Sequence, residues 1–235
     1  MSPRALPIAV VHLDESCLGN GQEGPNPGGA AGLIEVRTPS GVKRREFYIH
    51  APATTNNKMA LAGAIAVLQL LAGKGNRLQV LLVSDAEYLI RGVREWMPDW
   101  VARGWKRKGG AIENLDLWRV LHASLDRHRV QLSWVRGHAG HPKNEFANAL
   151  AMRAAREQLT SEGIVETTFA EWLAAERAKS RYVGYDADEA FAALERRLAR
   201  AEPIPLVLEE EAEARRAISP RSSAGWSMCS GRGIP

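Results

Sequence analysis

Apolar and polar residues along the first two thirds of the chain follow the spacing of strands and helices in turn. Short β-branched runs predict five strands, at 7–14, 32–37, 42–50, 78–84 and 130–135. Helical spacing of Ala, Leu and other apolar residues predicts helices at 59–71, 87–100 and 115–127 and from Pro142 onward. We therefore expect an α/β fold, a five-stranded mixed sheet flanked by helices, with a helical C-terminal extension.

The pattern changes after the last of these helices. The pairs Thr168/Glu171 and Asp186/Glu189 match capping boxes, and apolar residues on one face follow each, which predicts two short amphipathic helices. Two prolines, an acidic run at 209–211 and a Ser/Gly-rich end follow, a composition typical of disorder. We therefore divide the chain into a domain at 1–157, a helical extension at 158–202 and a disordered tail at 203–235.

Composition narrows the class of protein only moderately. The 235 residues carry a formal net charge of +4, which is compatible with a polyanionic partner. No run approaches 18 consecutive apolar residues and no signal-peptide pattern opens the chain, so we expect no membrane association and a cytoplasmic location. Cys17 and Cys229 lack metal-ligand spacing, which favours free thiols in a reducing compartment. Nothing in the composition indicates an oligomer, and a monomer is favoured.

The most informative segment is 134–144, which reads WVRGHAGHPKN. It places His138 on a glycine-flanked loop between the last predicted strand and a helix. Asp14 and Asp85 each lie at the end of an apolar strand elsewhere in the chain. Carboxylates at strand ends with a nearby histidine are typical of metal-dependent phosphodiester chemistry.

Six segments, in one consistent order, resemble type 1 ribonuclease H. They are 13–20 (LDESCLGN), 54–59 (TTNNKM), 84–88 (SDAEY), Trp105 with its basic neighbours, 114–118 (NLDLW) and 134–144. The resemblance covers about residues 5–157. It implies a ribonuclease H-like fold and an endonuclease that cuts the RNA strand of an RNA–DNA hybrid with two Mg²⁺ ions, for which Mn²⁺ can substitute.

The same resemblance implies which residues form the site, and this chain differs from the family pattern at two of them. Asp14 matches the acid that bridges both metal ions, Asp85 matches a second metal ligand, and His138 matches a mobile histidine that assists proton transfer or product release. The family's glutamate is replaced by Ala60, and its last aspartate is replaced by Asn148. Because two of four negative charges are lost, we expect weak metal binding and impaired activity.

Three acids are candidates to replace the missing ligands. Side chains alternate along a strand, so Glu15 should point away from the face of Asp14, toward solvent. Glu87 can contribute only if its strand continues past residue 85. Glu145 shares a helix face with Asn148 and is favoured of the three, although an acid near a helix N-terminus is ordinarily a surface residue.

Further positions match substrate-binding residues of the family. The match of Thr55 and Asn20 implies a pocket for a DNA-strand phosphate, and Asn56, Asn57 and the backbone of 17–19 match the region that reads ribose 2′-OH groups. Segment 100–108 resembles the family's basic protrusion, which grips the DNA strand; the alternative is a solvated helix end with its tryptophans in the core. The candidate substrate-binding residues are Cys17, Gly19, Asn20, Thr55, Asn56, Asn57, Trp100, Arg103, Trp105, Lys106, Arg107 and Lys108.

Three hypotheses about function remain open at this point. The first is a ribonuclease H-type enzyme that cuts hybrids. The second is a hybrid-binding module without catalysis. The third is a protein-interaction role carried by the extension, with Phe169, Trp172 and Phe191 as anchors.

Overall fold

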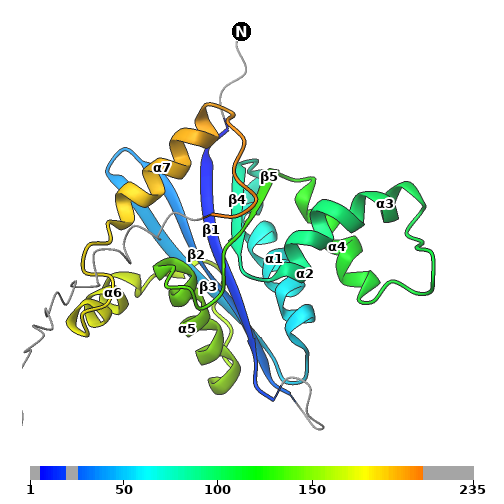
Figure 1. The fold of residues 1–235 in the computed structure, drawn as a ribbon, viewed down its shortest axis with the longest axis horizontal. Helices are drawn as coiled ribbons and strands as arrows, with labels where there is room; N and C mark the ends of the chain where they lie inside the picture. Colours follow the sequence, from blue (N-terminus) through cyan, green and yellow to red (C-terminus); the bar gives the residue numbers. More distant parts are fainter. Residues whose placement is uncertain (1–5, 20–25, 209–235) are drawn as a thin grey trace, which may run out of the picture.

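The computed structural model describes residues 6–19 and 26–208, which form a six-stranded mixed sheet with helices on both faces (Figure 1). The strand order is β5-β4-β1-β2-β3-β6. The strands are β1 (Ile8–Cys17), β2 (Gly28–Thr38), β3 (Gly41–Ala51), β4 (Gln79–Ser84), β5 (Arg129–Trp134) and β6 (Val165–Glu166). The helices are α1 (Asn56–Leu71), α2 (Glu87–Arg91), α3 (Met97–Ala102), α4 (Leu115–Leu125), α5 (Pro142–Glu157), α6 (Phe169–Ala178) and α7 (Ala187–Ala199).

The predicted mixed sheet is confirmed, with one strand more than expected. β1 pairs in parallel with β4, and β4 in parallel with β5, while β1, β2 and β3 are antiparallel neighbours. The sixth strand, β6, comes from the extension and pairs with the edge of β3. The extension is therefore joined to the same sheet as the rest of the domain.

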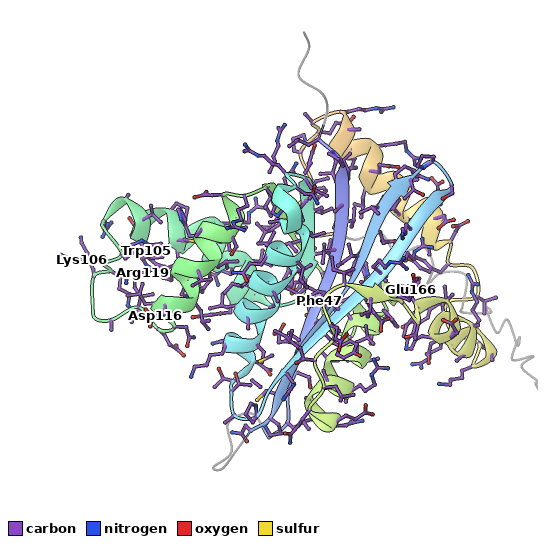
Figure 2. The ribbon with its side chains drawn as sticks, turned by 180° about the vertical axis from the view of Figure 1, so that it is seen from behind. Phe47, Trp105, Lys106, Asp116, Arg119 and Glu166 are labelled. Atoms are coloured by element: carbon purple, nitrogen blue, oxygen red, sulfur yellow. The ribbon has the colours of Figure 1, made fainter. Side chains whose placement is uncertain are left out.

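Alternation along β1 sorts its residues between two cores. Val11 and Leu13 face α1, which covers one side of the sheet with α4 packed beside it (Figure 2 shows this side). Val10 faces the opposite side, which α5 and α7 cover. This division decides which helix each site residue on β1 meets.

The helical stretch predicted at 87–100 is continuous but not uniform. A π-helical turn, Gly92–Trp96, separates α2 from α3. A Cβ at Gly92 would lie 2.0 Å from Cη2 of Trp118, so the indole packs directly on the glycine backbone. The π turn, which ends at Trp96, changes the direction of the side chains that follow it, among them Trp100.

The extension packs against the domain through its apolar residues. Asp186 caps α7, accepting from the backbone N–H groups of the next helical turn at 2.9 and 3.0 Å. Phe169 and Phe191 are 2% and 0% exposed, and Trp172 lies against Phe146 and Phe169. The hypothesis that Phe169 and Phe191 anchor another protein is wrong, because both are already buried within this chain. Phe169 packs against α5 and β2, and Phe191 packs against β1 and β4.

The chain then runs along β5. The Trp134 N–H donates to the Leu206 carbonyl at 2.7 Å, and the Leu208 N–H donates to the Trp134 carbonyl at 2.9 Å. Residues 203–208 thus lie on the sheet edge, although they fall in the segment expected to be disordered. Residues 209–235, with the acidic run 209–211 and Cys229, lie outside the described part of the chain. Among the described helices none is both long and apolar enough to span a bilayer.

Candidate metal centre and nucleic-acid pocket

The end of β4 opens one edge of β1. Parallel pairing between the two strands stops at Leu13 and Ser84, and Asp85 follows directly. β1 itself continues to Cys17, paired only with β2 on its other side. Side chains of Asp14 and Glu15 can therefore turn around the open edge toward Asp85, whichever face of the sheet they leave from.

Three carboxylates meet at this edge, and we call them the acidic cluster: Asp14, Glu15 and Asp85. One oxygen from each lies within 4.8 Å of the others. Oε2 of Glu15 is buried and has no hydrogen-bond partner among the described residues. The expectation that Glu15 faces solvent is wrong. Alternation does direct Glu15 to the opposite face of the sheet from Asp14. The face of Glu15 is covered by α1 rather than by solvent, and the open edge of β1 lets its carboxylate reach the cluster.

Glu15 lies on the same side of the sheet as Ala60, the position where the resemblance to ribonuclease H leads us to expect glutamate. Leu13, two residues before Glu15 on β1, and Ala60 share one core. One turn further along α1, a Cβ on Gly63 would lie 2.8 Å from Cβ of Ala30, the residue paired with Glu15 on β2. Glu15 therefore leaves β1 on the side of the sheet that α1 covers, and the small Ala60 side chain on α1 is 1% exposed.

Burial and mutual repulsion favour the protonated forms of the cluster. Burial, followed by the charge of Asp85, raises the pKa of Asp14 well above its ordinary value. The same two causes raise the pKa of Glu15 to about 8. Burial also raises the pKa of Asp85. A cation placed among these groups would relieve this cost, because it stabilises their charged forms.

The loop before α5 closes the cluster from the other side. A Cβ on Gly137 would lie 2.3 Å from Oδ2 of Asp85, so only glycine permits this approach. Nδ2 of Asn144, in the first turn of α5, donates to Oδ2 of Asp14 at 2.9 Å. The indole Nε1 of Trp134 donates to the Asp85 carbonyl at 3.0 Å and fixes the backbone there.

The remaining predicted catalytic residues surround the cluster without joining it. His138 has a φ of 50° and is exposed at the rim, with Nδ1 4.0 Å from the Glu145 carboxylate. Glu145, the favoured replacement, raises the pKa of Asp14 and Asp85 through its charge but lies outside the three-carboxylate group. Asn148 is half-buried one turn further along α5, and Glu87 is exposed at the start of α2.

Predicted substrate residues gather at the start of α1. Thr55 caps this helix, its Oγ1 accepting from the Lys58 N–H at 3.3 Å, and Asn56 and Asn57 form the first turn. Sγ of Cys17 lies 3.4 Å from the Thr54 carbonyl, which brings the end of β1 beside this turn. Gly19 follows with a φ of 75°, and Asn20 lies outside the described residues.

The predicted basic protrusion extends far from the sheet, as the labels of Trp105 and Phe47 in Figure 2 show. Lys106, Arg107 and Lys108 are exposed there, and Arg103 pairs with Asp99. Neither the edge nor one face of the Trp105 ring is free. The ring packs edge-on against His122, with 5.7 Å between the ring centroids, and the guanidinium of Arg119 lies over it.

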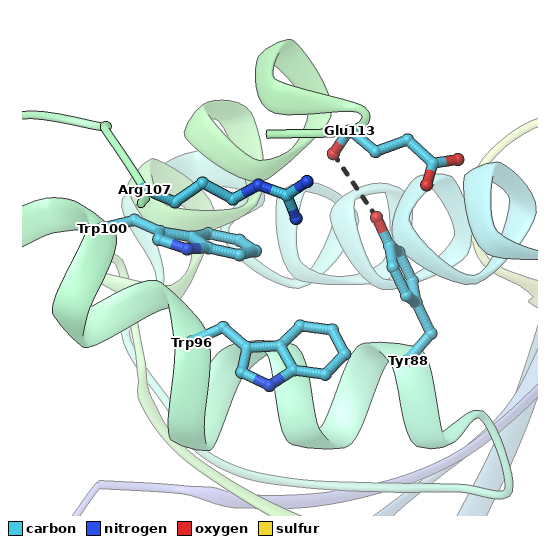
Figure 3. A pocket seen from close by; sticks show the side chains of 5 residues that line it. All are labelled: Tyr88, Trp96, Trp100, Arg107 and Glu113. Atoms are coloured by element: carbon cyan, nitrogen blue, oxygen red, sulfur yellow. Dashed lines mark hydrogen bonds between the residues drawn. The ribbon is translucent and has the colours of Figure 1, made fainter. Parts of the chain in front are cut away.

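A pocket of about 320 Å³ lies between the protrusion and α2, and we call it the aromatic pocket (Figure 3). Its lining residues are Tyr88, Trp96, Trp100, Arg107 and Glu113. The Tyr88 hydroxyl donates to the Glu113 carbonyl at 3.4 Å and accepts from Trp118 Nε1 at 3.1 Å. Trp100 and Arg107 were predicted to bind substrate. Tyr88 and Trp96, which are not among the predicted residues, line the same pocket, and Trp96 and Trp100 are four residues apart and so share a helix face.

A mixed sheet with carboxylates gathered where β1 passes the end of β4, and a histidine loop beside them, defines a ribonuclease H-like protein with a candidate divalent-metal centre. A sequence profile of the RNase H family matches residues 7–156, so the chain belongs to that family and the predicted resemblance is confirmed. The helical extension lies entirely beyond the matched region.

Known proteins agree with this assignment. Ribonuclease H of Xanthomonas campestris pv. campestris (strain 8004) is 42% identical over 149 residues, which are 63% of this chain and 92% of that protein. The solved structure of LC9-RNase H1, described as a type 1 RNase H with the type 2 active-site motif, is 47% identical with a TM-score of 0.68 and covers 73% of this chain and 82% of that one. The foamy viral protease-reverse transcriptase, solved with an RNA/DNA hybrid, shares the fold at 17% identity and a TM-score of 0.54, over 67% of this chain and 21% of that one.

Proposed function

We propose that this protein cleaves the RNA strand of RNA–DNA hybrids, and that Glu15 supplies the carboxylate that the family otherwise carries at the position of Ala60. The observation that carries the proposal is the convergence of Asp14, Glu15 and Asp85 within 4.8 Å. This arrangement replaces our expectation that two lost acids leave the site impaired. The family's last aspartate, which is Asn148 in this chain, is then the one acid for which the cluster offers no substitute carboxylate.

The residues fit Mg²⁺ or Mn²⁺. These ions prefer hard oxygen ligands, and the acidic cluster offers carboxylates only. Oε2 of Glu15 is a buried oxygen that could bind a metal ion, and no hydrogen bond from the described residues satisfies it. Asn148 would add an uncharged carbonyl oxygen. When bound as a pair, such ions activate the attacking water and stabilise the developing charge on the leaving oxygen.

The chain's own groups orient and transfer protons around that centre. Asp14 is held by the Glu15 N–H at 2.7 Å and by Asn144 at 2.9 Å, which fixes both of its oxygens. His138 stands at the exposed rim within reach of Glu145. We assign its imidazole the proton exchange with the cleaved strand, because this ring is exposed at the rim of the acidic cluster and has one nitrogen that can accept a proton and one that can donate it.

Two surfaces are suited to the hybrid itself. The start of α1, with Thr55, Asn56 and Asn57, offers hydroxyl and amide donors for the sugar–phosphate backbone. The aromatic pocket offers the flat faces of Trp96 and Trp100, with Arg107 beside them, for the sugars or bases of the DNA strand (Figure 3).

A cleavage assay on an end-labelled hybrid with Mg²⁺, and separately with Mn²⁺, tests the proposal. Wild-type protein should cut the RNA strand, and Asp14→Asn and Glu15→Gln should each abolish cutting. Glu87→Gln is the matched control, because Glu87 is an exposed acid two residues past Asp85 and outside the acidic cluster. Salt-sensitive hybrid binding by the wild type without any cutting would overturn the proposal in favour of a binding module.

A further inference from the structure

One buried lysine of α5 contacts the extension. Lys143, the second residue of α5, is 1% exposed, and its Nζ lies 2.8 Å from Oε2 of Glu35, which is 0% exposed. The same ammonium donates to the carbonyl of Ala187, the first residue of α7, at 3.2 Å. Burial of this charge therefore depends on the extension.

Alternating charges continue this contact to the outside of α7. Arg44 Nε lies 2.8 Å from Oε1 of Glu35, and Arg44 Nη2 lies 2.5 Å from the Asp188 carboxylate on α7. Asp188, Arg44, Glu35 and Lys143 thus form a chain of opposite charges from α7 across the sheet to the start of α5. A buried charged pair is costly unless its geometry is well satisfied, so this chain defines one position of α5 relative to α7.

The residue after Lys143 is the one that holds Asp14. Asn144 is 2% exposed and donates to Oδ2 of Asp14 at 2.9 Å. Two neighbouring residues in the first helical turn cannot move independently. Contacts that hold Lys143 therefore restrain the backbone from which the Asn144 side chain extends toward Asp14.

We propose that Lys143 is a positioning residue, and that the extension, by burying it between Glu35 and Ala187, holds Asn144 so that Asp14 is oriented to bind metal. The metal-binding part of this inference rests on the proposed function. The orientation of the Asn144 amide by Lys143 does not, and is tested separately below.

Attachment of α7 alone does not require this lysine. Phe191, Leu194 and Leu198 are 0–1% exposed and bury α7 against Val10, Leu81 and Val83 of the sheet. Two turns further along α7, Arg37 of β2 pairs with Glu195 at 2.7 Å, which ties α7 to the sheet through residues outside α5. Glu195→Gln is therefore a matched control that weakens the docking of α7 without touching Lys143.

The experiment uses the full chain and three variants: Lys143→Met, the double variant Glu35→Leu/Lys143→Met, and the control Glu195→Gln. The double variant replaces the buried pair by apolar groups, an exchange that is often neutral or stabilising, so it keeps the fold testable if Lys143→Met fails to fold. The first readout is the side-chain amide signal of Asn144 and its hydrogen exchange, measured by ¹⁵N NMR without metal. The second is Mn²⁺ affinity, measured well below the melting temperature.

We expect the Asn144 amide to exchange faster and to shift in the variants that lack Lys143, and their Mn²⁺ affinity to fall by about 10-fold, the effect usual for groups that orient a metal ligand. Glu195→Gln should change neither. If the double variant keeps the wild-type Asn144 signal, the positioning role is overturned whatever happens to the melting temperature. Failure of the wild type to bind Mn²⁺ or cut hybrids would instead overturn the proposed function, while the Asn144 signal still decides this inference.

Discussion

Exchanging the two positions that differ from the family pattern tests whether Glu15 has taken the place of the missing acid. The single variant Glu15→Gly removes the carboxylate from β1. The single variant Ala60→Glu adds one from α1, where the present side chain is 1% exposed. The double variant returns the carboxylate to the helix and leaves the total charge of the site unchanged.

The structure sets the expected size of each effect. Groups that only orient a metal ligand are worth 10- to 100-fold in affinity or activity, so removal of a ligand itself should cost about 100-fold or more, roughly 2.7 kcal/mol. Ala60→Glu forces a fourth carboxylate beside three whose pKa values burial and repulsion already raise, and should lower the melting temperature of the metal-free protein. In the double variant that crowding is absent.

Cleavage of labelled hybrid over a range of Mg²⁺ concentrations, together with thermal melts, measures both effects. We expect Glu15→Gly to be inactive, Ala60→Glu to be less stable, and the double variant to recover both activity and melting temperature. Wild-type activity in Glu15→Gly would refute the reasoning. So would a folded double variant that is as inactive as Glu15→Gly.

Three further predictions follow from the same geometry. Folding raises the pKa of Glu15 from an ordinary 4.5 to about 8, so the folded protein keeps a proton that the unfolded chain releases. The free energy of unfolding of the metal-free protein should therefore fall as pH rises from about 5 to 8, by at most about 1.4 kcal/mol per pH unit. Thermal melts of Glu15→Gln should show a flatter dependence on pH. Gly137→Ala places a Cβ 2.3 Å from an oxygen of the acidic cluster and should weaken Mn²⁺ binding, measured by calorimetry, by about 10-fold. Gly184→Ala is the control, because a Cβ there meets no atom within 4 Å, and it should not change the affinity. Equal affinities in the two variants would contradict the close approach of Gly137 to the cluster. Trp96→Ala should weaken hybrid binding by about 1–3 kcal/mol in fluorescence anisotropy, while Val101→Ala, on exposed α3 surface, should leave it unchanged; no difference between them would exclude the aromatic pocket from binding.

Much of the sheet could be predicted because each strand carries a strong local signal. The apolar run at 78–84 indicates a buried parallel strand, and Asp14 and Asp85 at strand ends indicate where acids converge. β6 could not be predicted in this way, since two residues, Val165 and Glu166, have no periodicity of their own.

Glu15 was misjudged for a physical reason that one strand cannot reveal. Alternation correctly gives the face of the sheet, but not where the neighbouring strand ends. Because β4 stops opposite Leu13, the next residues lie at an open edge and both faces meet there. Position on a strand relative to its partner, rather than alternation alone, decides whether a side chain reaches the site.

The two helices of the extension were predicted, but the partner of their apolar faces could not be, because amphipathic helices look the same whether that partner is another protein or the same chain. Phe169 and Phe191 predict an apolar face, and only the three-dimensional structure shows that α5 and the sheet already cover it. Lys143 gave no signal at all in the sequence, since a lysine in the first turn of a helix is ordinarily a surface residue.

The most direct test of the account is the number of metal ions that Glu15 helps to hold. Calorimetric titration of Mn²⁺ into wild-type protein and Glu15→Gln, each saturated with a non-cleavable hybrid, measures it. The account predicts two ions for the wild type and the loss of at least one, or a drop of about 100-fold in its affinity, in Glu15→Gln. Equal stoichiometry and equal affinity in the two proteins would contradict it.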